Sequence, residues 1–72
     1  MLEKFKEFAK ENGLEFSYTI DKDYDAHRLI FINPKTGGRF SYMMHTPELQ
    51  AHKRNDLQGF IEFILDDARK LI

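Results

Sequence analysis

Cysteine is entirely missing from this 72-residue sequence, and so is any long apolar run. Without cysteine the chain has no disulfide, no thiolate metal ligand and no cysteine nucleophile. Small secreted domains usually depend on disulfides, so the composition favours a reducing, cytoplasmic location. The longest apolar run, Leu29 to Ile32, is far too short to cross a bilayer, and the charged start MLEKFKEFAK lacks a signal-peptide core. We therefore expect no membrane contact.

The motifs of the common enzyme classes are missing as well. Ser17 and Ser41 are the only serines, and neither lies in a G-x-S-x-G nucleophile motif. The segment from Lys35 to Gly38 leads into a predicted strand, whereas a phosphate-binding loop needs a helix at that point. We therefore expect a protein that is not an enzyme and that binds no cofactor.

The acidic and histidine side chains do not match a metal-binding motif. Asp21, Asp23 and Asp25 fit the first half of a calcium loop. However, Ala26 stands where that loop needs glycine, and Ile32 stands where it needs a bidentate glutamate. The segment therefore predicts a polar hairpin turn and no metal. The histidines lack the spacing of a helical zinc site, and we expect them at strand ends and on the surface: His27, His45 and His52.

Hydrophobic periodicity predicts a helix followed by three strands. In residues 2–12 the apolar side chains recur at helical spacing, and Gly13 follows as a stop signal. Residues 14–20 alternate between apolar and polar side chains, which is typical of a strand with one buried face. Residues 27–32 and 39–45 predict the second and third strands.

The turn before the third strand, residues 33–38, contains one proline and two glycines. Proline pre-sets φ, and one of the glycines can adopt the positive φ that hairpin loops often require. In the third strand we expect Phe40, Tyr42 and Met44 to face the core and Met43 to face outward, because side chains alternate along a strand.

Two helix-start signals follow the third strand. Thr46 predicts an N-cap, with Pro47 at the first helical position. Asn55, with Gln58 three residues on, predicts a second cap. The last helix has one apolar face, formed by Leu57, Phe60, Ile61, Ile64, Leu65, Ala68 and Leu71. The pattern allows either a short extra helix before the last one or a single helix over residues 47–72.

Together these elements predict one α+β domain over residues 1–72. We expect a three-stranded antiparallel meander with the N-terminal and C-terminal helices packed on one face, in the order α-β-β-β-α. Aromatic residues make up 14% of the chain, which indicates a packed core.

The basic side chains suggest nucleic acid as an alternative partner. Residues 33–54 hold four bases and one acid, the bases being Lys35, Arg39, Lys53 and Arg54. The order of elements resembles that of the double-stranded-RNA-binding domain, in which lysines cluster at the start of the last helix. The resemblance covers topology and no motif. The net charge is −1, and three aspartates in the first hairpin would repel phosphate, so nucleic-acid binding is the second interpretation.

The centre of the second strand is apolar at four consecutive positions: Leu29, Ile30, Phe31 and Ile32. Side chains alternate between the two faces, so one pair faces the helices and the other pair faces away; the pattern leaves open which. The neighbouring strands place Arg39 and other polar residues around the outward pair, with Met43 among them. An apolar centre with a polar rim is typical of a partner surface. Phe63 also lies off the apolar stripe of the last helix.

We therefore predict a small non-catalytic protein-interaction module of the adaptor or inhibitor type. Its partner is another protein, a second copy of the chain, or both. The residues that we expect at the contact are Leu29, Ile30, Phe31, Ile32, Arg39, Met43 and Phe63.

Overall fold

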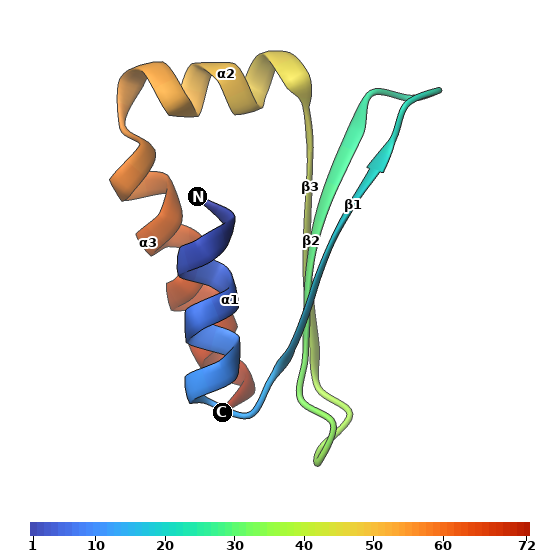
Figure 1. Ribbon diagram of the computed structural model, residues 1–72, viewed down its shortest axis with the longest axis vertical. Coiled ribbons are helices and arrows are strands. Elements are labelled where there is room, and N and C mark those ends of the chain that lie inside the picture. The colour runs from blue at the N-terminus through green and yellow to red at the C-terminus, as the bar shows by residue number, and fades with distance from the viewer.

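A computed structural model describes all residues from 1 to 72 (Figure 1). Its elements, in chain order, are α1 (Leu2–Glu11), β1 (Glu15–Asp21), β2 (Ala26–Ile32), β3 (Arg39–His45), α2 (Thr46–Asn55), α3 (Leu57–Ala68) and a final 3-10 turn, η1 (Arg69–Leu71). The three strands form one antiparallel sheet in the order β1-β2-β3. The predicted α+β meander is therefore confirmed, and of the two alternatives for its last part the structure has the extra helix before the last one.

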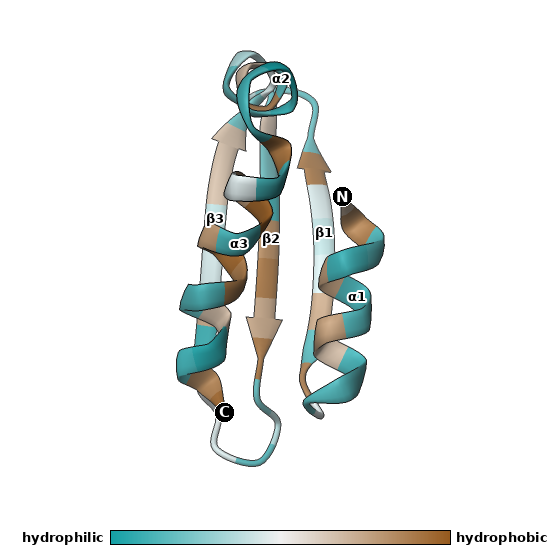
Figure 2. Cartoon of the chain, turned by 90° about the vertical axis from the view of Figure 1, so that its left-hand side faces the viewer, coloured by the Kyte–Doolittle hydropathy of each residue, from teal (hydrophilic) through white to brown (hydrophobic).

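All three helices lie on the same side of the sheet, and the other side is uncovered (Figure 1). α1 runs beside β1 and α3 runs beside β3, so the two helices cover the sheet together (Figure 2). α2 lies across one end of this layer (Figure 1). The molecule therefore has two layers, as predicted, and its sheet has one covered and one uncovered face.

The core fills the space between the sheet and the helices. Its largest fully buried side chains are Phe5, Leu29, Phe31, Met44 and Ile64. Phe31 of β2 lies at the middle of a phenylalanine cluster, with rings from α1 and from both neighbouring strands at centroid distances of 4.9 to 6.5 Å. Two of these contacts are edge-on, one is tilted and one is stacked. Aromatic contacts of these kinds add to the stabilisation from burial. The cluster holds α1 against the sheet.

The register of the sheet decides which pair of β2 faces the helices. Phe31 is paired with a phenylalanine on each neighbouring strand, so the three rings share the covered face. Leu29 lies on that face too, and both side chains are fully buried. Ile30 and Ile32 therefore face away from the helices and are only partly buried. In β3 the outward position predicted for Met43 is confirmed, because its side chain is half exposed.

The β2–β3 turn is explained by backbone requirements. Gly37 has a φ of +77° and donates its NH to the Asn33 carbonyl at 2.8 Å, which confirms the predicted positive-φ glycine. The Asn33 side chain accepts the NH of Lys35 at 2.9 Å. Its Nδ2 donates to the Leu71 carbonyl at 2.7 Å, which attaches the end of the chain to the turn.

Both predicted helix starts exist, but their caps differ from the prediction. Thr46 is the first residue of α2 and His45 occupies the N-cap position, with no capping hydrogen bond from its own side chain. The N-cap of α3 is Asp56, whose carboxylate accepts the Gly59 NH at 2.8 Å; Asn55 is the last residue of α2. The break falls at Asp56 because its backbone is extended, with φ −158° and ψ 80°. A single helix over residues 47–72 is thereby excluded.

Candidate functional site

No helix covers one face of the sheet, and we call this face the open face (Figure 1). Alternation along the three strands places on it Glu15, Ser17, Thr19, Asp21, Ala26, Arg28, Ile30, Ile32, Arg39, Ser41, Met43 and His45. Ile30 lies between serines of the two outer strands, and Ile32 lies between Glu15 and Arg39. Met43 is 50% exposed. The open face therefore has a small apolar centre and a polar rim.

The residues predicted for a partner surface fall into three groups. Leu29 and Phe31 are fully buried under the helices, so they are out of reach of a partner. The open face carries Ile30, Ile32, Arg39 and Met43. Phe63 is 52% exposed, but it belongs to α3, and its ring contacts Tyr42 at a centroid distance of 6.0 Å on the covered side. Phe63 and the open face are therefore separate surfaces.

Sequence reasoning did not include Arg28 in the site. Arg28 is exposed and is paired with Met43, which brings a third charged side chain close to the apolar centre. The signal was present, because Arg28 precedes Ile30 by two positions and strand residues two apart share a face. This spacing placed Arg28 on the open face only after the structure had shown that Ile30 lies on that face.

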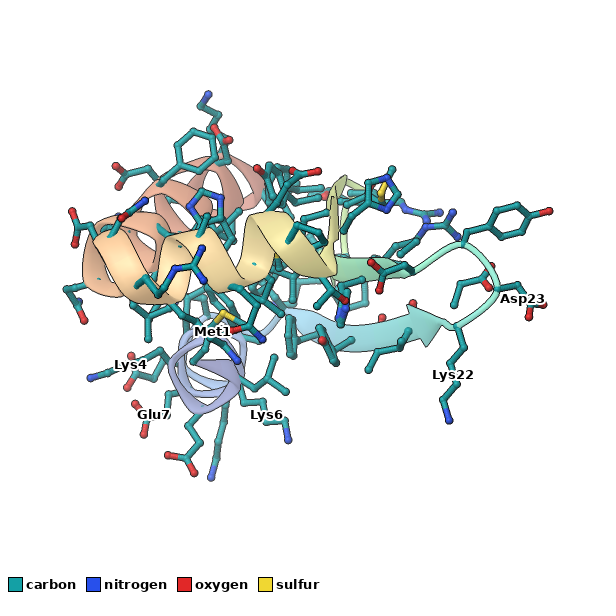
Figure 3. All side chains as sticks on the ribbon, turned by 90° about the horizontal axis from the view of Figure 1, so that it is seen from above. Met1, Lys4, Lys6, Glu7, Lys22 and Asp23 are labelled. Carbon is teal, nitrogen blue, oxygen red and sulfur yellow. The ribbon has the colours of Figure 1, made fainter.

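The four bases predicted for nucleic acid do not form one patch. Lys35 lies in the β2–β3 turn, whereas Lys53 and Arg54 lie in the last turn of α2, at the other end of the molecule (Figure 1). Arg39 lies on the open face. Acids and bases also project side by side at the periphery, as shown by Lys4, Lys6 and Glu7 on α1 and by Lys22 and Asp23 at the hairpin (Figure 3). A phosphate backbone is bound best by bases concentrated on one face.

A chain of hydrogen-bonded side chains connects β1, β2 and the start of α2. His27 lies at its middle and is only 9% exposed, which corrects the predicted surface position. The Tyr18 hydroxyl lies 2.5 Å from His27 Nδ1, and Thr46 Oγ1 lies 2.9 Å from His27 Nε2. The Thr46 hydroxyl donates to the Asp25 carboxylate. The Thr46 hydroxyl oxygen then accepts a hydrogen bond from His27 Nε2–H. In this tautomer His27 Nδ1 accepts a hydrogen bond from the Tyr18 hydroxyl, so both ring nitrogens of His27 have a partner.

The electrostatics of this chain favour a structural role. The hydroxyl of Thr46 and then its backbone NH, 3.1 Å from the carboxylate, hold the pKa of Asp25 below its ordinary value. Burial raises the pKa of the Tyr18 phenol, which makes its ionisation harder rather than easier. A catalytic base or nucleophile needs the opposite change in Tyr18. The aspartates of the hairpin are also engaged locally, since Asp21 Oδ1 accepts the Asp23 NH at 3.1 Å.

A groove of about 490 Å³ lies between α1, β1, α2 and α3. It is lined by Met1, Leu2, Glu3, Tyr18, Leu49, Lys53 and Leu57. Sequence reasoning missed it because four separate elements form its wall. Lys53 and Glu3 bring opposite charges to it, and the Tyr18 hydroxyl is already engaged with His27. The groove therefore lacks the convergent polar groups that orient a small ligand.

No three side chains of His, Asp or Glu gather where they could share a metal ion. None of the helices combines the length and the apolar character that crossing a bilayer requires. Comparison with protein-family models, with curated proteins and with solved structures found no match to this chain.

Proposed function

We propose that the chain is a small, non-catalytic protein-interaction module that docks through the open face of its sheet. The observation that supports this most strongly is the uncovered apolar centre formed by Ile30, Ile32 and Met43. The helices form a layer over the other face of the sheet, and no element of the chain forms one over this apolar centre (Figure 1). A partner that completes this layer fits an adaptor or inhibitor role. The lack of cysteine is compatible with a cytoplasmic setting.

The residue types on the open face support the same proposal. Arginine and methionine are enriched in the centres of protein interfaces, and the open face carries Arg39 and Met43. Methionine is flexible and polarisable, so it adapts to the shape of a partner. The serines beside Ile30 are short, which leaves that side chain accessible to a partner.

The test uses the immobilised chain as bait in a lysate of the organism that encodes it. Wild type is compared with Met43→Asp and with Ile72→Asp, a matched control because Ile72 is an exposed apolar residue beyond η1. We expect wild type and Ile72→Asp to retain the same protein and Met43→Asp to lose it, because an interface would bury the new charge without a partner. Equal retention by wild type and both variants would contradict the proposal. Phe63→Asp is tested in the same way. If it is the only variant that loses the retained protein, the contact surface lies on α3.

The nucleic-acid alternative is tested by titration at about 150 mM salt with duplex and single strands. Four phosphate contacts on duplex DNA would give a log–log salt slope of about −3.6. We expect weak binding or none, because the four bases are dispersed. Tight binding that disappears in Lys53→Glu/Arg54→Glu would favour the alternative over the protein-interaction module.

A further inference from the structure

The charges of the open face are distributed unevenly over its three strands. The acids Glu15 and Asp21 lie on β1, at its two ends, and the basic side chains Arg39 and His45 lie on β3, at the matching positions. β2 lies between the two strands and carries the two isoleucines. Neither Glu15 nor Arg39 forms an ion pair within the chain, since the ion pairs present involve other residues.

We propose that the open face binds the open face of a second copy of this chain, about a two-fold axis parallel to β2. This inference rests on the proposed function and names a second copy of the chain as the partner. The rotation places β1 of one copy over β3 of the other. Glu15 then faces Arg39, and Asp21 faces His45, each pair occurring twice by symmetry. Along the axis the two isoleucines of β2 meet their own equivalents.

The alternative two-fold axis, perpendicular to the strands, gives a poor match. It places each strand over itself with its direction reversed. Glu15 would then face Asp21, so acids meet acids, and Arg39 would face His45 with no acid opposite either of them. Ile30 would face Arg28. Like charges opposed across an interface are unfavourable, so the charge pattern selects the axis parallel to β2.

The size of the open face limits the affinity of this dimer. Three strands about 4.8 Å apart and seven residues long, at about 3.3 Å per residue, give a face of about 14 by 23 Å. That is roughly half of the area that each partner contributes to a standard interface. We therefore expect a weak, reversible dimer with a Kd on the order of 0.1 mM.

Arg28 gives the dimer geometry a distinctive signature. Arg28 lies on β2, so the two-fold axis brings it close to the Arg28 of the second copy. Two like charges near the axis oppose association. Replacing Arg28 by serine should therefore strengthen the dimer, by about threefold or more, although it removes a large side chain from the interface. A surface that binds only an unrelated protein gives no reason for this effect.

Sedimentation equilibrium over about 20 µM to about 1 mM, which spans the expected Kd, tests the proposal. Glu15→Arg and Arg39→Glu should each weaken the dimer about tenfold, because each replaces two attractive pairs by two repulsive ones. The double variant should return to within about threefold of wild type. Glu7→Lys on the outer side of α1 is the charge control and should leave the dimer unchanged (Figure 3).

The outcomes separate this inference from the proposed function. A wild type that stays monomeric to about 1 mM, or a double variant as weak as the single ones, overturns the homodimer. The interaction module survives that result if Met43→Asp still loses a protein partner. A dimer that no open-face substitution affects overturns the homodimer through this face, and the Met43→Asp result with a protein partner then decides on the interaction module. If a charge variant fails to fold, the salt dependence of the wild-type dimer is the test. The dimer should weaken between about 50 mM and about 500 mM salt, because salt screens its ion pairs. A dimer that salt does not weaken would overturn the proposed charge pairing.

Discussion

The carboxylate of Asp25 accepts hydrogen bonds from both the backbone NH and the hydroxyl of Thr46, the first residue of α2. Asp25 has a φ of +52°, a conformation that Asp and Asn adopt more readily than most residues. The free NH groups at the start of a helix need acceptors. For α2 an acceptor is supplied by the β1–β2 hairpin, so this contact fastens α2 to the sheet.

Removing the Asp25 carboxylate should loosen that attachment. Asp25→Asn loses the negative charge but keeps a side chain that tolerates the positive φ. Asp25→Ala loses both the charge and a side chain suited to the positive φ. We expect urea midpoints in the order wild type, Asp25→Asn, Asp25→Ala, measured by circular dichroism at neutral pH. Coincident midpoints would show that the hairpin does not hold α2.

The same contact makes stability depend on acidity. Hydrogen bonds from Thr46 lower the pKa of Asp25 from its ordinary value of 3.8, so the folded state releases this proton more readily than the unfolded state does. The stabilisation is therefore present above about pH 4 and is lost as the pH falls through the folded-state pKa. The difference in unfolding free energy between wild type and Asp25→Asn should stay constant down to about pH 5 and narrow below about pH 4. A difference that widens in acid would contradict this assignment.

Tyr18→Phe should destabilise the fold by about 1–2 kcal/mol, because it leaves Nδ1 of the buried His27 without its donor. Burial raises the pKa of Tyr18, so the unfolded state ionises first and wild type loses stability above about pH 10. Tyr18→Phe should lack this alkaline loss. Tyr24→Phe is the control, since Tyr24 is 75% exposed at the hairpin. Urea unfolding at neutral and alkaline pH measures both effects.

Gly59→Ala should not give the stabilisation that alanine usually brings to a helix. A Cβ at this position would overlap the carboxylate of Asp56, which caps α3 through the Gly59 NH. The gain of about 0.5–1 kcal/mol from helix propensity is then offset by a disturbed cap. In an Asp56→Ala background the same change should stabilise by about 0.5 kcal/mol or more. Thermal unfolding of the four proteins checks this, and equal effects of Gly59→Ala in both backgrounds would refute it.

Local patterns predicted the elements well because each pattern depends on neighbouring residues only. The alternation of Phe40, Tyr42 and Met44 defined the covered face of β3, and the structure agrees. β2 has no alternation at its centre, so the facing of Ile30 depended on the register with the other strands. The cap of α2 was missed because Asp25 lies 21 residues before Thr46 and reaches it only in the folded chain.

Met43→Asp should leave the monomer folded. Met43 is half exposed on the open face and does not belong to the core. The expected loss is about 1 kcal/mol or less, as for most surface substitutions. Denaturant unfolding of dilute protein gives the value. A loss of about 3 kcal/mol or more would mean that Met43 is a core residue and that our facing of β3 is wrong.

The central claim is that the open face is the contact surface, and methyl NMR of isoleucine and methionine tests it most directly. Spectra are recorded as the chain is concentrated from about 20 µM to about 1 mM, or as a retained partner is added. The account predicts shifts at Ile30, Ile32 and Met43, whereas the buried methyl groups of Ile64 and Met44 and the exposed Ile72 stay unchanged. Binding of a partner that shifts Ile72 and leaves the three open-face residues unchanged would contradict the claim.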